Sequence, residues 1–272
     1  MQTIAFIGGG NMASAIVGGL IAAGRAPGTL IVVEPGDAQR QLLAERFGVV
    51  PLAVADSSLA TAGLVIWAVK PQFFLAAAAP CAPHVAGALQ LSVMAGIRSD
   101  AIAVATQSDR IVRAMPNTPA LIGKGVAGVF ARPAVSRDDR QRVEAVLAPT
   151  GEIVWIDRED ALDAVTALSG SGPAYVFHLI EAMLVAAREM GLPEAEARRL
   201  AVQTVAGAAA LAASSSETPE VLRKNVTSPG GTTEAAMALL ESRGVKDAFV
   251  AAILAARDRA RELGDAFGAV PH

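Results

Sequence analysis

The sequence predicts an α/β domain followed by an all-α helical domain. Short β-branched runs alternate with helix-forming segments as far as about residue 157, and beyond that point the strand signals stop. The remainder is rich in Ala, Leu, Glu and Arg, which are good helix formers. Alternating strands and helices are typical of βαβ units around a parallel sheet. We therefore predict domains at residues 1–157 and 158–272.

Seven segments of the first domain are predicted strands. Each is a short run rich in Val, Ile, Leu or aromatic residues, and we expect them to form one parallel sheet. The segments are 3–8, 30–34, 63–70, 89–93, 110–114, 125–130 and 152–157.

The second domain is predicted to consist of helices separated by sharp breaks. Thr218 and Pro219 fit the N-cap and the first position of one helix. Two longer segments, 173–190 and 193–213, are apolar around most of their circumference and must be buried. A small helical domain has little interior for both. We expect a subunit interface, in a homodimer or larger oligomer, to cover them; the alternative is a compact core within one chain.

Composition excludes several classes of protein. The chain has 272 residues, a formal net charge of -3 and 4% aromatic residues, with no cluster of Lys or Arg. It therefore lacks the basic surface that binds nucleic acids or anionic membranes. Apolar windows are interrupted before about 18 residues, so no membrane span is expected. A single cysteine, Cys81, and an N-terminus without a signal sequence predict a cytoplasmic protein.

A glycine-rich loop joins the first predicted strand to a helix that begins near Asn11. Gly8, Gly10 and Ala13 occupy the positions of the G-x-G-x-x-G/A pattern. The first glycine permits a tight turn, the second lets a pyrophosphate approach the backbone, and the small third residue lets helix and strand pack closely. The helix N-terminus then faces the phosphates. This arrangement predicts a Rossmann dinucleotide-binding domain.

Further strand ends are expected to border the same crevice, because ligands of this fold lie outside the carboxyl ends of the strands. Glu34 ends the second strand, where a carboxylate accepts the ribose hydroxyls of NAD and repels a 2′-phosphate. Arg40 is near in sequence, and a solvated strand end is the alternative for Glu34. The small residues Ala95 and Gly96 suit the approach of a flat ring. The third strand ends in Ala68, Val69, Lys70 and Pro71.

No catalytic acid–base pair is evident in the sequence. His84, His178 and His272 lack metal-ligand spacing, and Cys81 has no CxxC partner. We therefore expect no metal site. A dinucleotide fold without an acid–base pair fits a reaction in which hydride transfer is the hard step, such as reduction of an already protonated imine.

The segment "SPGGTT", residues 228–233, interrupts the helices of the second domain. Pro229 fits a first helical turn, and the bare glycine backbone lets successive N–H groups point at one anion. We predict a carboxylate site that needs no Lys or Arg; a plain helix cap with a glycine hinge is the alternative. The residues assigned to this site are Ser228, Gly230, Gly231, Thr232 and Thr233.

Six motifs together resemble the pyrroline-5-carboxylate reductase family. They run in order through nearly the whole chain, and the last two are the most specific. The resemblance implies a Rossmann domain, a helical dimerisation domain that interlocks with its partner, and NAD(P)H-dependent reduction of L-1-pyrroline-5-carboxylate to L-proline, the last step of proline biosynthesis. The motifs are "FIGGGNMASAI", "WAVKPQ", "SVMAGI", "RAMPNTPA", "TALSGSGPAYVF" and "NVTSPGGTTEAAMALLE".

The resemblance also implies positions for the bound molecules. Thr232 and Thr233 would contact the carboxylate of the substrate or of proline, and Thr233, the candidate catalytic residue, would orient the ring nitrogen. Glu159 would border the substrate, and Asn225 would reach the cofactor from the helical domain. The other cofactor contacts would fall on Ile7, Gly8, Gly9, Gly10, Asn11, Met12, Ala68, Val69, Lys70, Pro71, Val93, Met94 and Ala95.

Two departures from the family concern the choice between NAD and NADP. Many members carry polar or basic residues after the second strand, which accommodate the 2′-phosphate of NADP. This chain has "EPGD" there, and Asp56 where the family often has an asparagine near the adenosine. We therefore expect better use of NAD than is usual in the family, with NADP as the alternative.

Two other functions fit parts of the sequence. A related small-acid or cyclic-imine dehydrogenase of the hydroxyacid type would need a catalytic lysine in residues 173–190, which contain none. A non-catalytic NAD-binding regulatory or scaffold protein would have no use for the 228–233 loop. Both are therefore weaker interpretations than the reductase.

Overall fold

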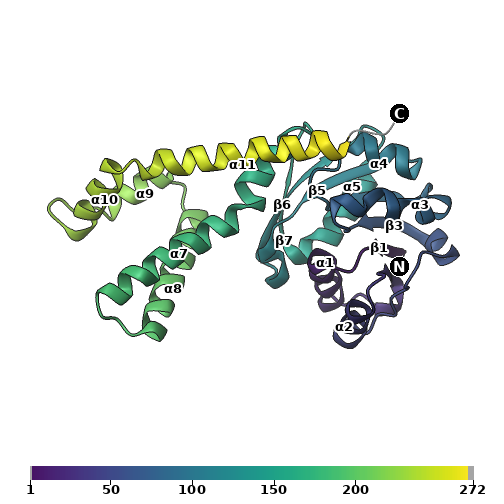
Figure 1. Ribbon diagram of the computed structural model, residues 1–272, viewed down its shortest axis with the longest axis horizontal. Coiled ribbons are helices and arrows are strands. Elements are labelled where there is room, and N and C mark those ends of the chain that lie inside the picture. Colours follow the sequence, from purple (N-terminus) through teal and green to yellow (C-terminus); the bar gives the residue numbers. More distant parts are fainter. Residues whose placement is uncertain (1, 269–272) are drawn as a thin grey trace. The chain divides into compact units, whose positions relative to one another are not determined.

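A computed structural model describes residues 2–268, which form two compact units (Figure 1). Of the described residues, the first unit contains 2–171 and 256–268, and the second spans Gly172–Ala255. The chain leaves the first unit later than the change of composition at 157/158. Val165, beyond residue 157, still packs against the sheet. Its side chain fills the space beside Gly128 on β6, where a Cβ would lie 2.6 Å from Cγ1 of Val165.

A seven-stranded sheet forms the centre of the first unit. Its strands are β1 (Thr3–Ile7), β2 (Leu30–Val33), β3 (Ala62–Trp67), β4 (Leu89–Ser92), β5 (Ile111–Met115), β6 (Gly125–Ala131) and β7 (Gly151–Trp155). The strand order is β2-β1-β3-β4-β5-β6-β7. All seven predicted strands are confirmed, and neighbouring strands run parallel except for β5 and β6.

The antiparallel β5–β6 pair corrects the expectation of a wholly parallel sheet. β5 ends at Met115 and β6 begins at Gly125, so the nine residues 116–124 connect them. A parallel connection needs about a dozen residues or more, usually including an α-helix. This connection holds only a 3₁₀ turn, Thr118–Ile122. The chain therefore returns antiparallel, directly beside β5.

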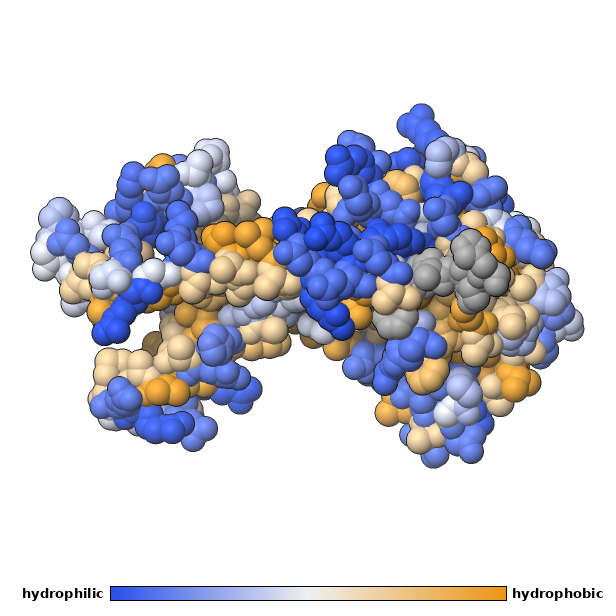
Figure 2. Space-filling view, turned by 45° about the horizontal axis from the view of Figure 1, so that its top comes forward, coloured by the Kyte–Doolittle hydropathy of each residue, from blue (hydrophilic) through white to orange (hydrophobic). Residues whose placement is uncertain are grey.

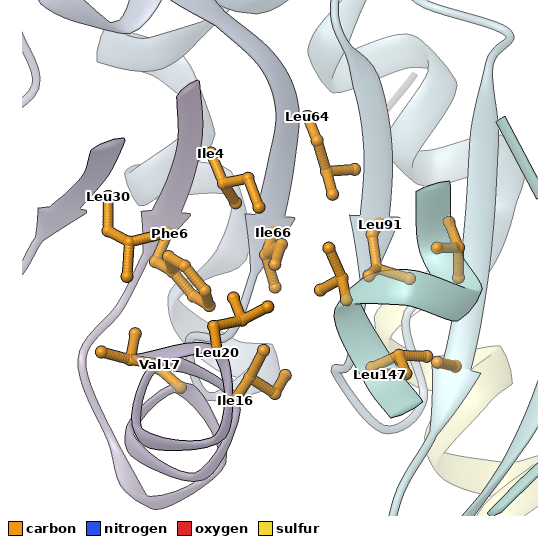
Figure 3. Packing of buried hydrophobic residues seen from close by; sticks show 14 of the residues in the cluster. Ile4, Phe6, Ile16, Val17, Leu20, Leu30, Leu64, Ile66, Leu91 and Leu147 are labelled. Atoms are coloured by element: carbon orange, nitrogen blue, oxygen red, sulfur yellow. The ribbon is translucent and has the colours of Figure 1, made fainter. Parts of the chain in front are cut away.

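Helices cover both faces of the sheet. They are α1 (Asn11–Ala22), α2 (Asp37–Phe47), α3 (Phe74–Val85), α4 (Ser99–Thr106), α5 (Arg137–Leu147) and α6 (Ala161–Val165). Alternate residues of β1 belong to two cores. Ile4 and Phe6 pack with α1 and α5, whereas Ala5 and Ile7 pack with α3 and α4. Figure 3 shows the first core, with Phe6 lying over the apolar side of α1.

Gln90 on β4 is a buried polar residue whose amide is fully paired. Its Oε1 accepts a hydrogen bond from Nε1 of Trp67 at 2.8 Å, and its Nε2 donates to the carbonyl oxygens of Val85 at 2.8 Å and Ala88 at 3.0 Å. A buried indole N–H without a partner is costly. Gln90 therefore fixes Trp67, the last residue of β3, just before the chain enters the crevice.

The second unit consists of helices. They are α7 (Gly172–Glu189), α8 (Glu194–Ser214), α9 (Pro219–Asn225), α10 (Thr232–Ser242) and the first part of α11 (Val245–Gly268). α7 packs against α8. The predicted start of α9 is confirmed, since Oγ1 of Thr218 accepts the N–H of Val221 at 3.4 Å and Pro219 is the first helical residue.

The helical unit has almost no core of its own. Between Gly172 and Ala255 the buried residues are three alanines, Ala187, Ala197 and Ala201. Large apolar side chains face outward instead: Phe177 is 58% exposed and Leu239 is 59% exposed. Figure 2 shows such hydrophobic residues, in orange, on the surface of this unit. The alternative expectation, that a compact core within one chain buries these helices, is therefore wrong.

No helix within residues 2–268 is both long enough and apolar enough to span a membrane.

Candidate active site

A cavity of about 590 Å³ lies at the carboxyl ends of β1, β2 and β3. The strand order reverses between β1 and β3, and ligands of open α/β sheets bind at such a reversal. The lining is mostly apolar. Several of the residues predicted to contact a dinucleotide line it: Ile7, Gly8, Gly10, Glu34, Ala68, Val69 and Lys70.

The other predicted cofactor residues do not line this cavity. Asn11 and Met12 form the first turn of α1. Met94 is buried in the core with α3 and α4, where 3% of its surface is exposed. Asn225, the last residue of α9, donates through Nδ2 to Oε2 of Glu217 at 3.0 Å within the second unit. Their roles stay predictions, as do those of Gly9, Pro71, Val93 and Ala95.

Much of the cavity wall was missed by sequence reasoning. One side of α3 carries small residues at helical spacing, a signal that the sequence contained. Residues 53–55 follow an isolated β-bridge between Val33 and Leu52, and no pattern marks them. Burial raises the pKa of the Cys81 thiol to about 11, which suits an inert wall residue. The missed residues are Val33, Pro35, Ala53, Val54, Ala55, Phe73, Ala76, Ala77, Pro80 and Cys81.

Gly8 and Gly10 leave the backbone bare for different reasons. Gly8 has φ +96°, and a Cβ there would lie 2.8 Å from the carbonyl oxygen of Ala68. Gly10 is the N-cap of α1, and nothing lies within 4 Å of the position that its Cβ would take. The first N–H groups of α1 have no intrahelical partner. Open space beside free N–H groups at a helix N-terminus fits the pyrophosphate of a dinucleotide.

Glu34 is tied to the glycine loop at the end of β2. Its Oε2 accepts the N–H of Gly9 at 2.8 Å, and its Oε1 accepts the N–H of Gly36 at 2.9 Å. Each carboxylate oxygen keeps a further lone pair for a ribose hydroxyl. Arg40 donates to the carbonyl oxygen of Glu34 at 2.9 Å and pairs with Asp37. The only basic group predicted near the ribose is therefore already engaged within the protein.

Asp56 caps a local turn just outside the cavity lining. Its Oδ1 accepts the hydroxyl of Ser58 at 2.5 Å and the N–H of Ser58 at 2.9 Å. These hydrogen bonds lower the pKa of Asp56. The three residues before it, 53–55, line the cavity. The structure thus gives Asp56 a local role in shaping the segment beside the cavity.

The 228–233 loop precedes α10 in the second unit. Gly231 is the N-cap of α10, and Pro229 lies in the preceding turn, which corrects its predicted place in the first helical turn. The reason is Gly230, whose φ of +72° is incompatible with a helix starting earlier. The N–H of Gly230 donates to Oε2 of Glu234 at 2.7 Å. The first N–H groups of α10, beginning at Thr232, lack intrahelical partners.

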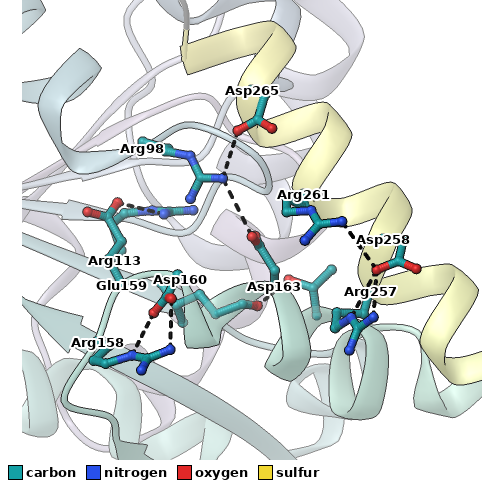
Figure 4. A network of polar contacts seen from close by, with 12 residues as sticks. Arg98, Arg113, Arg158, Glu159, Asp160, Asp163, Arg257, Asp258, Arg261 and Asp265 are labelled. Carbon is teal, nitrogen blue, oxygen red and sulfur yellow. Dashed lines mark hydrogen bonds and ion pairs between the residues drawn. The ribbon is translucent and has the colours of Figure 1, made fainter.

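Glu159 is engaged by three donors within the first unit. Its Oε1 accepts the N–H of Ser99 at 2.6 Å and Nη1 of Arg113 at 2.7 Å, and its Oε2 accepts the hydroxyl of Ser99 at 2.5 Å. Figure 4 shows the Glu159 carboxylate directed at Arg113. The contact of Glu159 with a substrate stays a prediction.

Among residues 2–268, no group of three or more His, Cys, Asp or Glu could hold a metal ion. His272 lies outside the described residues.

The chain is similar to known proteins over nearly its whole length. The family model for pyrroline-5-carboxylate reductase dimerisation matches residues 159–263, and one described as NADP oxidoreductase, coenzyme F420-dependent, matches residues 3–96. A pyrroline-5-carboxylate reductase from Pseudomonas aeruginosa is 40% identical over 97% of this chain and 98% of its own length.

Solved structures agree with these matches. A pyrroline-5-carboxylate reductase from Coxiella burnetii has a TM-score of 0.89 at 37% identity, and covers 96% of this chain and 98% of its own. A pyrroline carboxylate reductase from Plasmodium falciparum, solved with NADP bound, has a TM-score of 0.87 at 26% identity, and covers 97% of this chain and 98% of its own.

Gly10→Ala is expected to separate dinucleotide binding from folding. The backbone of Gly10, at φ -67° and ψ -167°, suits any residue, and a Cβ there meets no protein atom. The methyl group would instead occupy the space left for the pyrophosphate. We expect NADH and NADPH to bind about tenfold more weakly or worse, with an unchanged melting temperature, measured by fluorescence titration and calorimetry.

Gly8→Ala is the matched control. It combines a positive φ with a backbone clash at Ala68, so it should lose both stability and binding. Unchanged affinity in Gly10→Ala would show that the dinucleotide lies elsewhere.

Proposed function

The chain belongs to the pyrroline-5-carboxylate reductase family, and we propose that its glycine-loop crevice and its 228–233 loop carry out that family's reaction. The enzyme is an NAD(P)H-dependent oxidoreductase acting on a CH–NH bond: it reduces the C=N bond of L-1-pyrroline-5-carboxylate and gives L-proline. The observation that carries this proposal is the full-length similarity to such reductases, at 40% identity in one case.

The crevice of the first unit would hold the dinucleotide. The bare backbone of Gly10 and the first turn of α1 bind the pyrophosphate, and the Glu34 carboxylate accepts the ribose hydroxyls. When bound, the reduced nicotinamide supplies a hydride to the carbon of the C=N bond. The apolar wall of the cavity excludes water from the adenosine side.

The 228–233 loop would hold the substrate carboxylate. The first N–H groups of α10 point at the anion, the helix dipole favours it, and the hydroxyls of Thr232 and Thr233 add donors. Ser228, Gly230 and Gly231 shape the loop. We assign the hydroxyl of Thr233 to the ring nitrogen, which it orients by a hydrogen bond.

Proton transfer needs no residue of suitable pKa in this scheme. The imine takes its proton from water before the reduction. A hydride then adds to the carbon, the π electron pair moves to the nitrogen, and the iminium cation becomes a neutral amine. Thr233 therefore orients the nitrogen and does not act as a general acid, because a threonine hydroxyl has no useful pKa.

The helical unit serves self-association. It contains most of the region matched by the family's dimerisation model, and its large apolar side chains are exposed in a single chain. We propose a homodimer, or a larger oligomer built from dimers, in which α7 and α8 are covered. A cytoplasmic location is also proposed, because the single cysteine can form no disulfide within the chain.

The reaction itself is tested by turnover. Purified protein mixed with pyrroline-5-carboxylate and NADH or NADPH should consume the reduced cofactor, followed by its absorbance, with proline as the product. Absence of turnover with both cofactors, in protein shown to bind a dinucleotide, would rule out the reductase.

Thr233→Ala is expected to lower kcat/KM for pyrroline-5-carboxylate about tenfold through the loss of one hydrogen bond. Dinucleotide affinity should stay nearly unchanged. Thr233→Ser keeps the hydroxyl and is the matched control, which should retain most of the activity. Equal losses of activity and dinucleotide affinity in Thr233→Ala would mean that the loop does not hold the substrate.

Glu34→Ser is expected to raise the ratio of NADPH to NADH efficiency several-fold, because it removes the carboxylate that repels a 2′-phosphate. Affinity for both cofactors should fall as well, since the N–H groups of Gly9 and Gly36 lose their acceptor. The readout is therefore the ratio of kcat/KM values. An unchanged ratio would show that Glu34 only orders the loop.

A further inference from the structure

The loop between β4 and α4, residues 93–98, is held at its two ends by different parts of the first unit. At its start, the N–H of Val93 donates to the carbonyl oxygen of Trp67 at 3.0 Å, and the N–H of Met94 donates to Oγ of Ser92 at 3.3 Å. This end is therefore fixed by β3 and β4. Three of its residues, 93–95, are among the proposed cofactor contacts.

Glu159 fixes the other end of this loop. The N-cap residue of α4, Arg98, makes no side-chain capping bond. The carboxylate of Glu159, 60 residues further along the chain, takes this place by accepting both the N–H and the hydroxyl of Ser99. An anion at a helix N-terminus is favoured by the free N–H groups and the helix dipole. The 93–98 loop thus ends on a cap supplied by the linker after β7.

Arg113 on β5 holds the Glu159 carboxylate in place. The Arg113 side chain is 6% exposed, and its Nη1 lies 2.7 Å from Oε1 of Glu159. Arg98, the last residue of the loop, forms two further ion pairs. Its Nη2 lies 3.1 Å from Asp265 on α11 and 3.5 Å from Asp163 on α6 (Figure 4). The end of the loop is therefore bound through charged groups to β5, the linker, α6 and the end of α11.

We propose that Glu159 is a positioning residue that holds the 93–98 loop in the conformation that binds the dinucleotide, and that it does not contact the substrate. The inference rests on the proposed function, which places the cofactor against this loop. Three donors within the first unit already hold the Glu159 carboxylate, and its negative charge would repel the carboxylate of pyrroline-5-carboxylate.

Glu159→Gln and Ser99→Ala test this role. Glu159→Gln removes the negative charge and one acceptor oxygen. Ser99→Ala removes the hydroxyl hydrogen bond but keeps the bond from the backbone N–H of residue 99. Ser99→Ala is the milder change, and it keeps the test valid if Glu159→Gln fails to fold. We expect Glu159→Gln to bind NADPH and NADH about three- to tenfold more weakly, with a smaller effect in Ser99→Ala. KM for pyrroline-5-carboxylate, measured at saturating cofactor, should change little.

The matched control is Asp160→Asn in the same linker. Asp160 and Arg158 form an exposed ion pair, with 62% and 76% of their side chains exposed. The substitution should therefore leave dinucleotide binding unchanged. A second readout is the rise in melting temperature that saturating NADPH causes. A positioning role makes this rise smaller in Glu159→Gln, whereas a purely structural role lowers both melting temperatures equally and leaves the rise unchanged.

Two results would overturn the proposal. One is unchanged dinucleotide affinity and an unchanged melting-temperature rise in Glu159→Gln and Ser99→Ala. The other is a raised KM for pyrroline-5-carboxylate with normal dinucleotide binding, which would make Glu159 a substrate contact. Failure of the proposed function is seen separately, as wild-type protein that binds NADPH but turns over no pyrroline-5-carboxylate.

Discussion

The close approach of Gly8 to the backbone of Ala68 is the constraint on which the crevice depends. The N–H of Gly8 donates to Val33 at 2.8 Å, so the ends of β1, β2 and β3 meet at one residue without a side chain. The chain can then turn at once into α1, whose N-terminus faces the space beside Gly10. The Glu34 carboxylate, the first turn of α1 and the end of β3 all lie around this contact.

The two units obtain their stability in different ways. The first unit buries two hydrophobic cores on the faces of its sheet, and it closes a polar network around Gln90 and Trp67 within them. The second buries little more than three alanines between Gly172 and Ala255. Its helices therefore depend on apolar contacts from another chain, so the stability of the helical unit is linked to protein concentration by mass action.

Local sequence patterns predicted the strands and the glycine loop. The direction of β6, the partners of Glu159 and part of the cavity wall depend on tertiary contacts. The strands followed from apolar runs, and the glycine loop from the spacing of Gly8, Gly10 and Ala13. The antiparallel direction of β6 does not follow from its apolar run, because direction depends on the length of the connection after β5. Glu159 contacts Ser99, 60 residues away in the sequence, and Arg113, 46 residues away. No spacing rule for local motifs reaches that far. Residues 53–55 enter the cavity wall through one isolated bridge, which leaves no pattern in the sequence.

The N–H of Gly230 in the 228–233 loop donates to the carboxylate of Glu234 on α10, an acceptor close by in the chain. This hydrogen bond accompanies the left-handed conformation of Gly230, which has φ +72°. The same carboxylate sets a negative charge at one end of the loop. If the 228–233 loop holds the substrate carboxylate as proposed, this charge would direct it away from Gly230 and toward Thr232 and Thr233.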